Sequence, residues 1–177
     1  MSTDDGRRTR PVRRLLVPGR GIPSQTHWMH DWARRSGYIW APEPPGPPYD
    51  LAERVEALRV TIDADDTPAI LVAHSAGCLT VAGWAARHEG PVLAALLATP
   101  PFIPPEWMDV PRQALPFRSI LAASRTDPHC TPAQARAYAA DWGAEFFDAG
   151  DVGHLDGATG FGPWPDGEAL VERLGGH

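Results

Sequence analysis

Three side chains of the kind that cooperate in nucleophilic catalysis occur in the order Ser75, Asp127, His154 along this chain of 177 residues. A serine hydroxyl is a weak nucleophile at neutral pH, so it needs a base that removes its proton as it attacks. Histidine can supply that base, and a carboxylate on its other ring nitrogen fixes the tautomer and stabilises the imidazolium. If the fold brings the three together, we expect acyl transfer to water through an acyl-enzyme on Ser75.

The sequence around Ser75 is typical of a nucleophile elbow, a sharp turn between a strand and a helix. The apolar run 69–73 predicts the strand, and residues 76–88 carry apolar side chains at helical spacing. The motif Ala73-His74-Ser75-Ala76-Gly77 departs from Gly-x-Ser-x-Gly only at its first position, where alanine is the next smallest residue. A serine in such a turn is also a common helix N-cap, so the motif alone does not decide between the two roles.

Asp127 and His154 each follow a segment that predicts a strand, 117–123 and 144–147 respectively. Ligands of parallel α/β sheets bind beyond the carboxyl ends of the strands, so we expect both side chains at that edge, beside Ser75. An aspartate before proline is also a common turn residue. The competing candidates are His74 and His129 for the base, and Asp148, Asp151 and Asp156 for the acid.

The oxyanion of the expected intermediate requires backbone N–H donors near Ser75. The amide of Ala76, at the start of a helix, is one candidate, because negative charge is favoured there. The second donor is expected from the loop after the strand 13–17, through the backbone of Arg20 or Gly21. This loop lacks both the G-x-G-x-x-G pattern and the P-loop lysine, so a nucleotide site is not indicated.

The order of the remaining elements predicts one α/β domain with a six-stranded, mostly parallel sheet and helices on both faces. Strands are expected at 13–17, 38–41, 69–73, 92–98, 117–123 and 144–147, and helices at 25–36, 51–62, 76–88, 132–142 and 167–174. His27 and His30, at the start of the first helix, are expected to be solvated. We assign residues 13–177 to the domain and residues 1–12 to a mobile, arginine-rich tail.

The composition limits the possible partners. A net charge of −6 argues against a nucleic-acid partner, and no apolar run approaches the roughly 18 residues that indicate a membrane span. No secretory signal is recognised, and the two cysteines, Cys78 and Cys130, predict reduced thiols in a cytoplasmic protein. No zinc-ligand spacing is found, so neither a metal nor a cofactor is implied. The oligomeric state is left open.

Two proline-rich segments surround the expected site. Residues 99–116 contain six prolines together with large apolar side chains, so they either pack over the sheet edge or form the wall of an acyl pocket. Candidate pocket residues are Phe102, Trp107, Phe161 and Trp164. Residues 42–48 contain five prolines and are expected to form a stiff connector, with an SH3-type ligand as the alternative.

Several segments together resemble one known family. They are Val17-Pro18-Gly19 with the downstream His27-Trp28, Ala73–Cys78, Ser124–Pro128, Gly150–His154 and the tail Gly160-Phe161-Gly162-Pro163-Trp164-Pro165. Over residues 15–174 the chain resembles the retinoblastoma-binding protein 9 (YdeN-like) family of small α/β-hydrolases. The resemblance implies a minimal α/β-hydrolase fold without a large cap domain, a Ser75–His154–Asp127 triad and a serine hydrolase that is often esterase-like. Residues 41–49 depart from the acidic, tryptophan-containing segment of that family.

The sequence therefore predicts a serine hydrolase, carboxylesterase-like, that acts on a small, uncharged ester. Amide or thioester cleavage would use the same groups and stays open. The alternative from another class is a protein-binding module that keeps the fold without meaningful turnover.

Overall fold

A computed structural model of the chain describes residues 10–35, 37–44 and 48–176. Its six strands form one sheet in the order β2-β1-β3-β4-β5-β6. The strands are β1 (Arg13–Val17), β2 (Tyr38–Trp40), β3 (Ala69–His74), β4 (Val92–Ala98), β5 (Arg118–Ala123) and β6 (Glu145–Asp148). All neighbouring pairs are parallel, which confirms the predicted α/β class and places every carboxyl end at the same edge.

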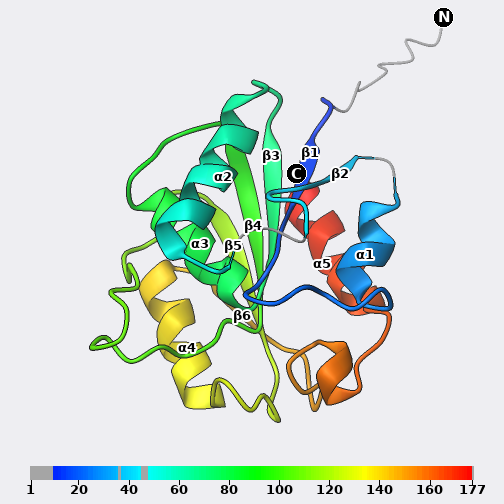
Figure 1. The fold of residues 1–177 in the computed structure, drawn as a ribbon, viewed down its shortest axis with the longest axis vertical. Coiled ribbons are helices and arrows are strands. Elements are labelled where there is room, and N and C mark those ends of the chain that lie inside the picture. Colours follow the sequence, from blue (N-terminus) through cyan, green and yellow to red (C-terminus); the bar gives the residue numbers. More distant parts are fainter. Residues whose placement is uncertain (1–9, 36, 45–47, 177) are drawn as a thin grey trace, which may run out of the picture.

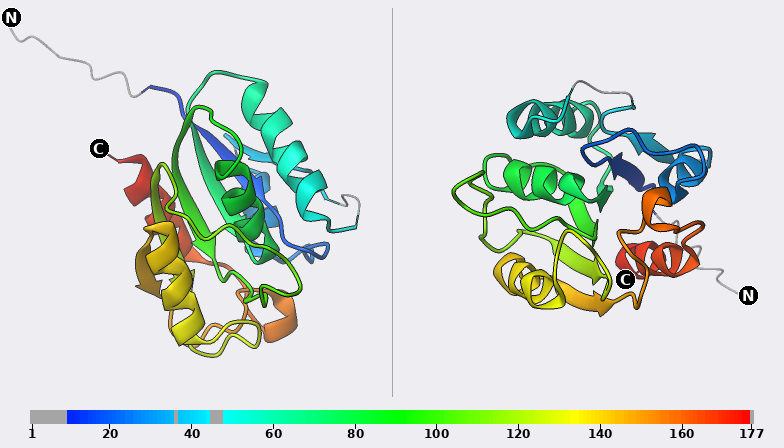
Figure 2. Two further views of the ribbon diagram at one scale, coloured as in Figure 1. Left: turned by 90° about the vertical axis from the view of Figure 1, so that its left-hand side faces the viewer. Right: turned by 60° about the horizontal axis from the view of Figure 1, so that its bottom comes forward.

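Helices cover both faces of the sheet (Figures 1 and 2). On one face lie α2 (Leu51–Asp63), α3 (Ala76–Ala85) and α4 (Pro132–Trp142), and on the other lie α1 (Trp28–Ala33) and α5 (Pro165–Gly175). A single 3₁₀ turn, η1 (Gly157–Thr159), follows β6 and was not predicted, because three residues are too few to show a periodic pattern. The described residues form no separate cap domain: the connection 99–117 between β4 and β5 contains neither helix nor strand.

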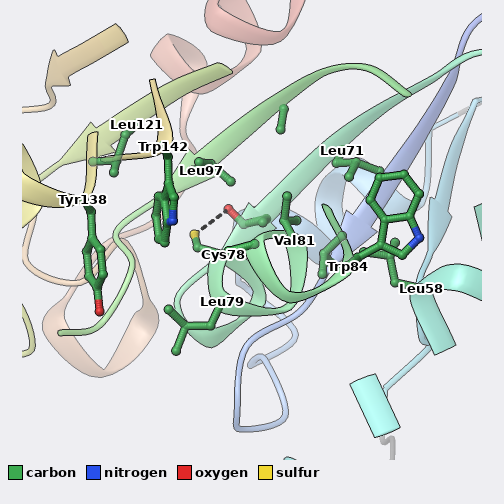
Figure 3. Packing of buried hydrophobic residues seen from close by; sticks show 14 of the residues in the cluster. Leu58, Leu71, Cys78, Leu79, Val81, Trp84, Leu97, Leu121, Tyr138 and Trp142 are labelled. Carbon is green, nitrogen blue, oxygen red and sulfur yellow. Dashed lines mark hydrogen bonds between the residues drawn. The ribbon is translucent and has the colours of Figure 1, made fainter. Parts of the chain in front are cut away.

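Alternate residues of the central strands face opposite sides of the sheet. Leu71, Leu97 and Leu121 pack with Trp84 and Trp142 under α2, α3 and α4, as Figure 3 shows. Their neighbours along the strands pack under α1 and α5. Burial of both faces explains the continuous apolar runs that predicted these strands.

Local signals account for several helix boundaries. The Asp50 side chain accepts from the Glu53 amide at the start of α2, and Thr131 forms a capping box with Gln134 at the start of α4. The helix expected at 25–36 is shorter in the structure, because the His27 ring accepts from the Met29 amide and acts as its N-cap.

Two expectations about the termini and loops lie partly outside the described residues. The structure does not describe residues 1–9 of the expected mobile tail or residues 45–47 of the proline-rich connector. In the part that the structure does describe, no helix is both long enough and apolar enough to cross a membrane.

Gly77 allows α3 to start directly against β1, and this contact provides a test of the fold. A Cβ at position 77 would lie 2.2 Å from the Val17 carbonyl oxygen and 2.9 Å from that of Pro18. A backbone carbonyl cannot relieve such a contact by changing rotamer, as the end of a flexible side chain can. We therefore expect Gly77→Ala to lower the free energy of unfolding by at least about 2 kcal/mol, although alanine favours helices.

Urea unfolding measures this loss, with Gly162→Ala as the matched control, because a Cβ there meets nothing within 4 Å. Equal midpoints for the two variants would contradict a close contact between α3 and β1.

Candidate active site

Ser75 occupies the turn between β3 and α3 in a strained conformation. Its φ is 55° and its ψ is −127°, a region that residues other than glycine rarely adopt. Its amide donates to the Ala98 carbonyl over 2.9 Å, which ties the turn to the end of β4. The Ser75 side chain makes no capping hydrogen bond to α3, so its hydroxyl is available to another partner.

That partner is His154. Its Nε2 lies 2.8 Å from Ser75 Oγ, and its Nδ1 lies 3.0 Å from Asp127 Oδ1. The side chains of His154 and Asp127 are only 6% and 2% exposed. An ionised carboxylate only accepts, so Nδ1 carries the ring proton and Nε2 accepts from the serine hydroxyl. The structure thus brings the three predicted residues together from three loops at the carboxyl edge of the sheet.

The competing acids have other roles in the structure. Asp148 forms an ion pair with Arg125 at 2.7 Å. Asp156 accepts from both the amide and the hydroxyl of Thr159 and so caps η1. Asp151 is exposed. Only Asp127 contacts the His154 ring through a hydrogen bond among the described carboxylates.

The competing histidines also have other partners. His74 contacts the backbone of His154 through its Nε2, which lies 2.8 Å from the His154 carbonyl oxygen. Burial lowers the pKa of His74 to about 3, so its ring is neutral at pH 7. The ring of His129 packs edge-on against that of His154, with centroids 4.6 Å apart.

The expectation that His27 is solvated is wrong. Its side chain is buried against Trp28 and His74, and burial lowers its pKa to about 4. Its Nδ1 accepts from the Met29 amide, so the proton of the neutral ring is on Nε2. That Nε2 is buried and has no hydrogen-bond partner among the described residues.

The loop after β1 passes directly beside Ser75. A Cβ added to Gly19 would lie 3.0 Å from Ser75 Cβ and 3.5 Å from its Oγ. The buried Arg54 guanidinium donates to the Gly19 carbonyl and holds the loop in place. Within the described part of the chain, the backbone N–H groups of Arg20 and Ala76 have no internal acceptor. These amides, which the sequence suggested as oxyanion donors, are therefore free to bind one.

A cavity of about 780 Å³ contains Ser75 and His154 in its wall. One part of the lining is apolar and another is polar. The apolar residues include Leu79, Phe102, Ile103, Trp107 and Met108, and the polar ones include Ser24, His27 and Asp156, with Arg20 and Gly21 beside them. Trp107 and Ile22 are 78% and 70% exposed, so both present apolar surface to solvent.

Two of the four predicted pocket residues do not reach this cavity. Trp164 is buried in the core, with its ring centroid 5.0 Å from that of Trp28 and stacked on Trp32. Phe161 borders a separate, smaller cavity. Both lie beyond the loop segment 156–158, which does line the cavity, and both pack in or against the core under α1 and α5.

The segment 99–116, which the sequence indicated as a possible wall of an acyl pocket, also brings Ile103 and Met108 to this cavity. Ile22 and Tyr49 also line the cavity, but nothing in their sequence surroundings distinguishes them from packing residues.

The two thiols are poor candidates for a nucleophile. Cys78 and Cys130 are both buried and unpaired. Burial raises the pKa of Cys130 to about 12 and raises that of Cys78 well above its ordinary value, so neither is a thiolate at neutral pH. A search of the described histidines, cysteines and carboxylates finds no group that could hold a metal ion.

The fold is shared with several hydrolases of known structure. A protein described as a YdeN-like hydrolase from Pectobacterium atrosepticum is 25% identical, with a TM-score of 0.83 over 93% of this chain and 90% of that one. The ydeN gene product of B. subtilis is 15% identical, with a TM-score of 0.67 over 92% and 97%. A carboxylesterase from Bacillus cereus is 17% identical, with a TM-score of 0.61 over 94% and 88%. At these last two identities the likeness shows the fold alone.

Comparison with curated protein sequences finds no significant match. The expected likeness to YdeN-like hydrolases is confirmed, whereas the link to retinoblastoma-binding protein 9 is not shown by these comparisons and stays a prediction. The family model described as "Serine hydrolase" matches residues 14–173, which is most of the sequence. The chain therefore belongs to the serine hydrolase family, and the protein is a hydrolase.

Proposed function

We propose that the protein is a carboxylesterase in which Ser75 is the nucleophile, His154 the general base and acid, and Asp127 the residue that orients the base. The observation that carries this proposal is the His154 ring, which bridges Ser75 Oγ at 2.8 Å and Asp127 Oδ1 at 3.0 Å. Both contacts fall within the distance that proton transfer and tautomer selection require.

In the first half of the reaction, Ser75 Oγ attacks the ester carbonyl as its proton passes to His154 Nε2. The negative oxygen of the tetrahedral intermediate accepts from the amides of Ala76 and of Arg20 or Gly21, where loss of one donor typically costs about 3 kcal/mol. His154 then returns the proton to the departing alcohol oxygen, and the ester bond breaks. In the second half, His154 takes a proton from water as the water oxygen attacks the acyl carbon. The bond from that carbon to Ser75 Oγ then breaks, the acid is released, and His154 returns the proton to Ser75 Oγ.

The lining of the cavity supports a small, uncharged acyl group as the substrate. Leu79, Phe102 and Ile103 provide apolar surface beside Ser75, and burial of apolar area is what such a pocket can offer an acyl chain. The exposed Trp107 extends this surface outward.

Labelling with a fluorophosphonate probe tests the assignment of the nucleophile. We expect stoichiometric labelling of the wild type, none of Ser75→Ala, and a fall in kcat of at least about 1,000-fold in that variant. Ser24→Ala is the matched control, because Ser24 lines the same cavity and its hydroxyl bonds only to the Thr26 hydroxyl among the described residues. Equal labelling of Ser75→Ala and the wild type, or none of either, would favour a binding module over an esterase.

The pH dependence of kcat/KM tests the base. His154 can accept the serine proton only when its ring is neutral, so the proposed mechanism requires activity to rise as this base loses its proton. The lowered pKa values of His27 and His74, about 4 and about 3, keep both rings neutral between pH 5 and 8. We therefore expect kcat/KM to rise between pH 5 and pH 8, and neither His27 nor His74 changes charge in this range to account for the rise.

The variant His129→Gln removes the imidazole that packs against His154, and the rise of kcat/KM with pH should persist in this variant. A rate that stays flat from pH 5 to 8 would contradict the role of His154.

A series of p-nitrophenyl esters from acetate to octanoate measures the acyl pocket. Removal of the Trp107 ring takes away apolar surface that a longer chain contacts but acetate does not. We expect Trp107→Ala to raise KM for the longer esters about threefold to tenfold, with little change in kcat. Ile39→Ala, which removes an exposed apolar side chain of β2, should leave all KM values unchanged. Identical effects on acetate and octanoate would argue against an acyl site at Trp107.

A further inference from the structure

The backbone around His154 is bound by side chains from distant parts of the sequence. The His154 amide donates to Thr159 Oγ1 over 2.9 Å. Its carbonyl oxygen accepts from His74 Nε2 at 2.8 Å and from Thr99 Oγ1 at 3.3 Å. The next carbonyl, that of Leu155, accepts from the Trp28 indole at 3.0 Å. Both the amide and the carbonyl group of His154 are therefore hydrogen-bonded, as they would be inside a strand.

Backbone strain is concentrated at the same place. Among the described residues other than glycine, Ser75, Thr99 and Leu155 have positive φ values, of 55°, 44° and 52°. Each such conformation costs about 1–3 kcal/mol and persists only where surrounding contacts determine it. One of the three is the proposed nucleophile, one follows His154, and one donates to the His154 carbonyl.

His74 is well suited to hold a carbonyl beside the base without adding charge. A carbonyl oxygen only accepts, so His74 Nε2 must carry the proton. The side chain is buried, and the neutral ring therefore offers a donor without placing a second positive charge next to the imidazolium that forms during catalysis. His74 and Ser75 are consecutive residues at the end of β3. The same strand therefore positions the serine and the loop that carries its base.

We propose that His74 and Thr99 are positioning residues, which hold the His154 carbonyl and thereby set the distance from His154 Nε2 to Ser75 Oγ. This inference rests on the proposed function, because it requires His154 to be the base. Neither residue needs to contact the substrate, so their removal should slow the chemical steps and leave binding unchanged.

Two matched pairs of variants test the proposal. Thr99→Val and His74→Met remove the donors with little change in volume, whereas Thr99→Ser keeps the hydroxyl and His74→Gln places an amide N–H near the position of Nε2. A misplacement of 1 Å can cost about a hundredfold, so loss of one of two donors should lower kcat about tenfold. We expect this fall in the Val and Met variants, KM within about twofold, and kcat within about threefold of wild type in the Ser and Gln variants.

Thr61→Val is the remote control, because it removes a threonine hydroxyl bond to a backbone carbonyl inside α2. Its kcat should match that of the wild type. The proposal is overturned if Thr99→Val and His74→Met keep wild-type kcat, or if the Ser and Gln variants lose as much as their partners. A loss of stability with unchanged kcat would show a merely structural role.

A second measurement separates this proposal from the proposed function. The proton between His154 Nδ1 and Asp127 gives a far-downfield NMR resonance when the ring is held in place. It should remain in Thr99→Ser and shift or broaden in Thr99→Val. If the wild type showed no hydrolysis that depends on Ser75, the esterase assignment would fail, yet this resonance would still decide whether Thr99 positions the ring.

Discussion

The position of the His154 ring is the constraint on which the rest of the site depends. Its two nitrogens must reach side chains 79 and 27 residues away, and hydrogen bonds to both tolerate errors of only a few tenths of an ångström. A parallel sheet solves most of this problem, because the carboxyl ends of β3, β5 and β6 meet at one edge. The remaining precision has to come from the loop itself, whose amide and carbonyl groups are bound by buried side chains.

Close packing between backbone segments also supports this arrangement of loops. Gly77 lets α3 approach the end of β1, and Gly19 lets the following loop approach Ser75. The N–H groups of Arg20 and Ala76, which lie on these two segments, have no acceptor among the described residues. An unpaired amide is costly in a core but useful where negative charge develops, which is the role proposed for these two N–H groups.

The sequence predicted the strands, most of the helices and the three central side chains, because each depends on a local signal. β1, β4 and α4 have the expected boundaries, since their apolar runs and caps are unambiguous. The pocket was harder to predict. Phe161 and Trp164 are apolar loop residues just as Phe102 and Trp107 are, and only the path of the chain after His154 sends them into or beside the core. That path includes the 3₁₀ turn η1 and its N-cap Asp156, which produce no periodic pattern in the sequence.

The four histidines near Ser75 show why residue type alone could not assign their roles. His27 and His74 lose their charge because burial removes the water that would solvate it, and the neutral His74 ring then donates from Nε2 to the His154 carbonyl. His154 is almost equally buried, but it differs in having a carboxylate at Nδ1, which offsets the cost of an imidazolium. If His154 is the base, as proposed, Asp127 would stabilise its protonated ring in place of solvent. In the proposed mechanism the neutral rings of His27 and His74 add no positive charge beside His154 when it gains a proton.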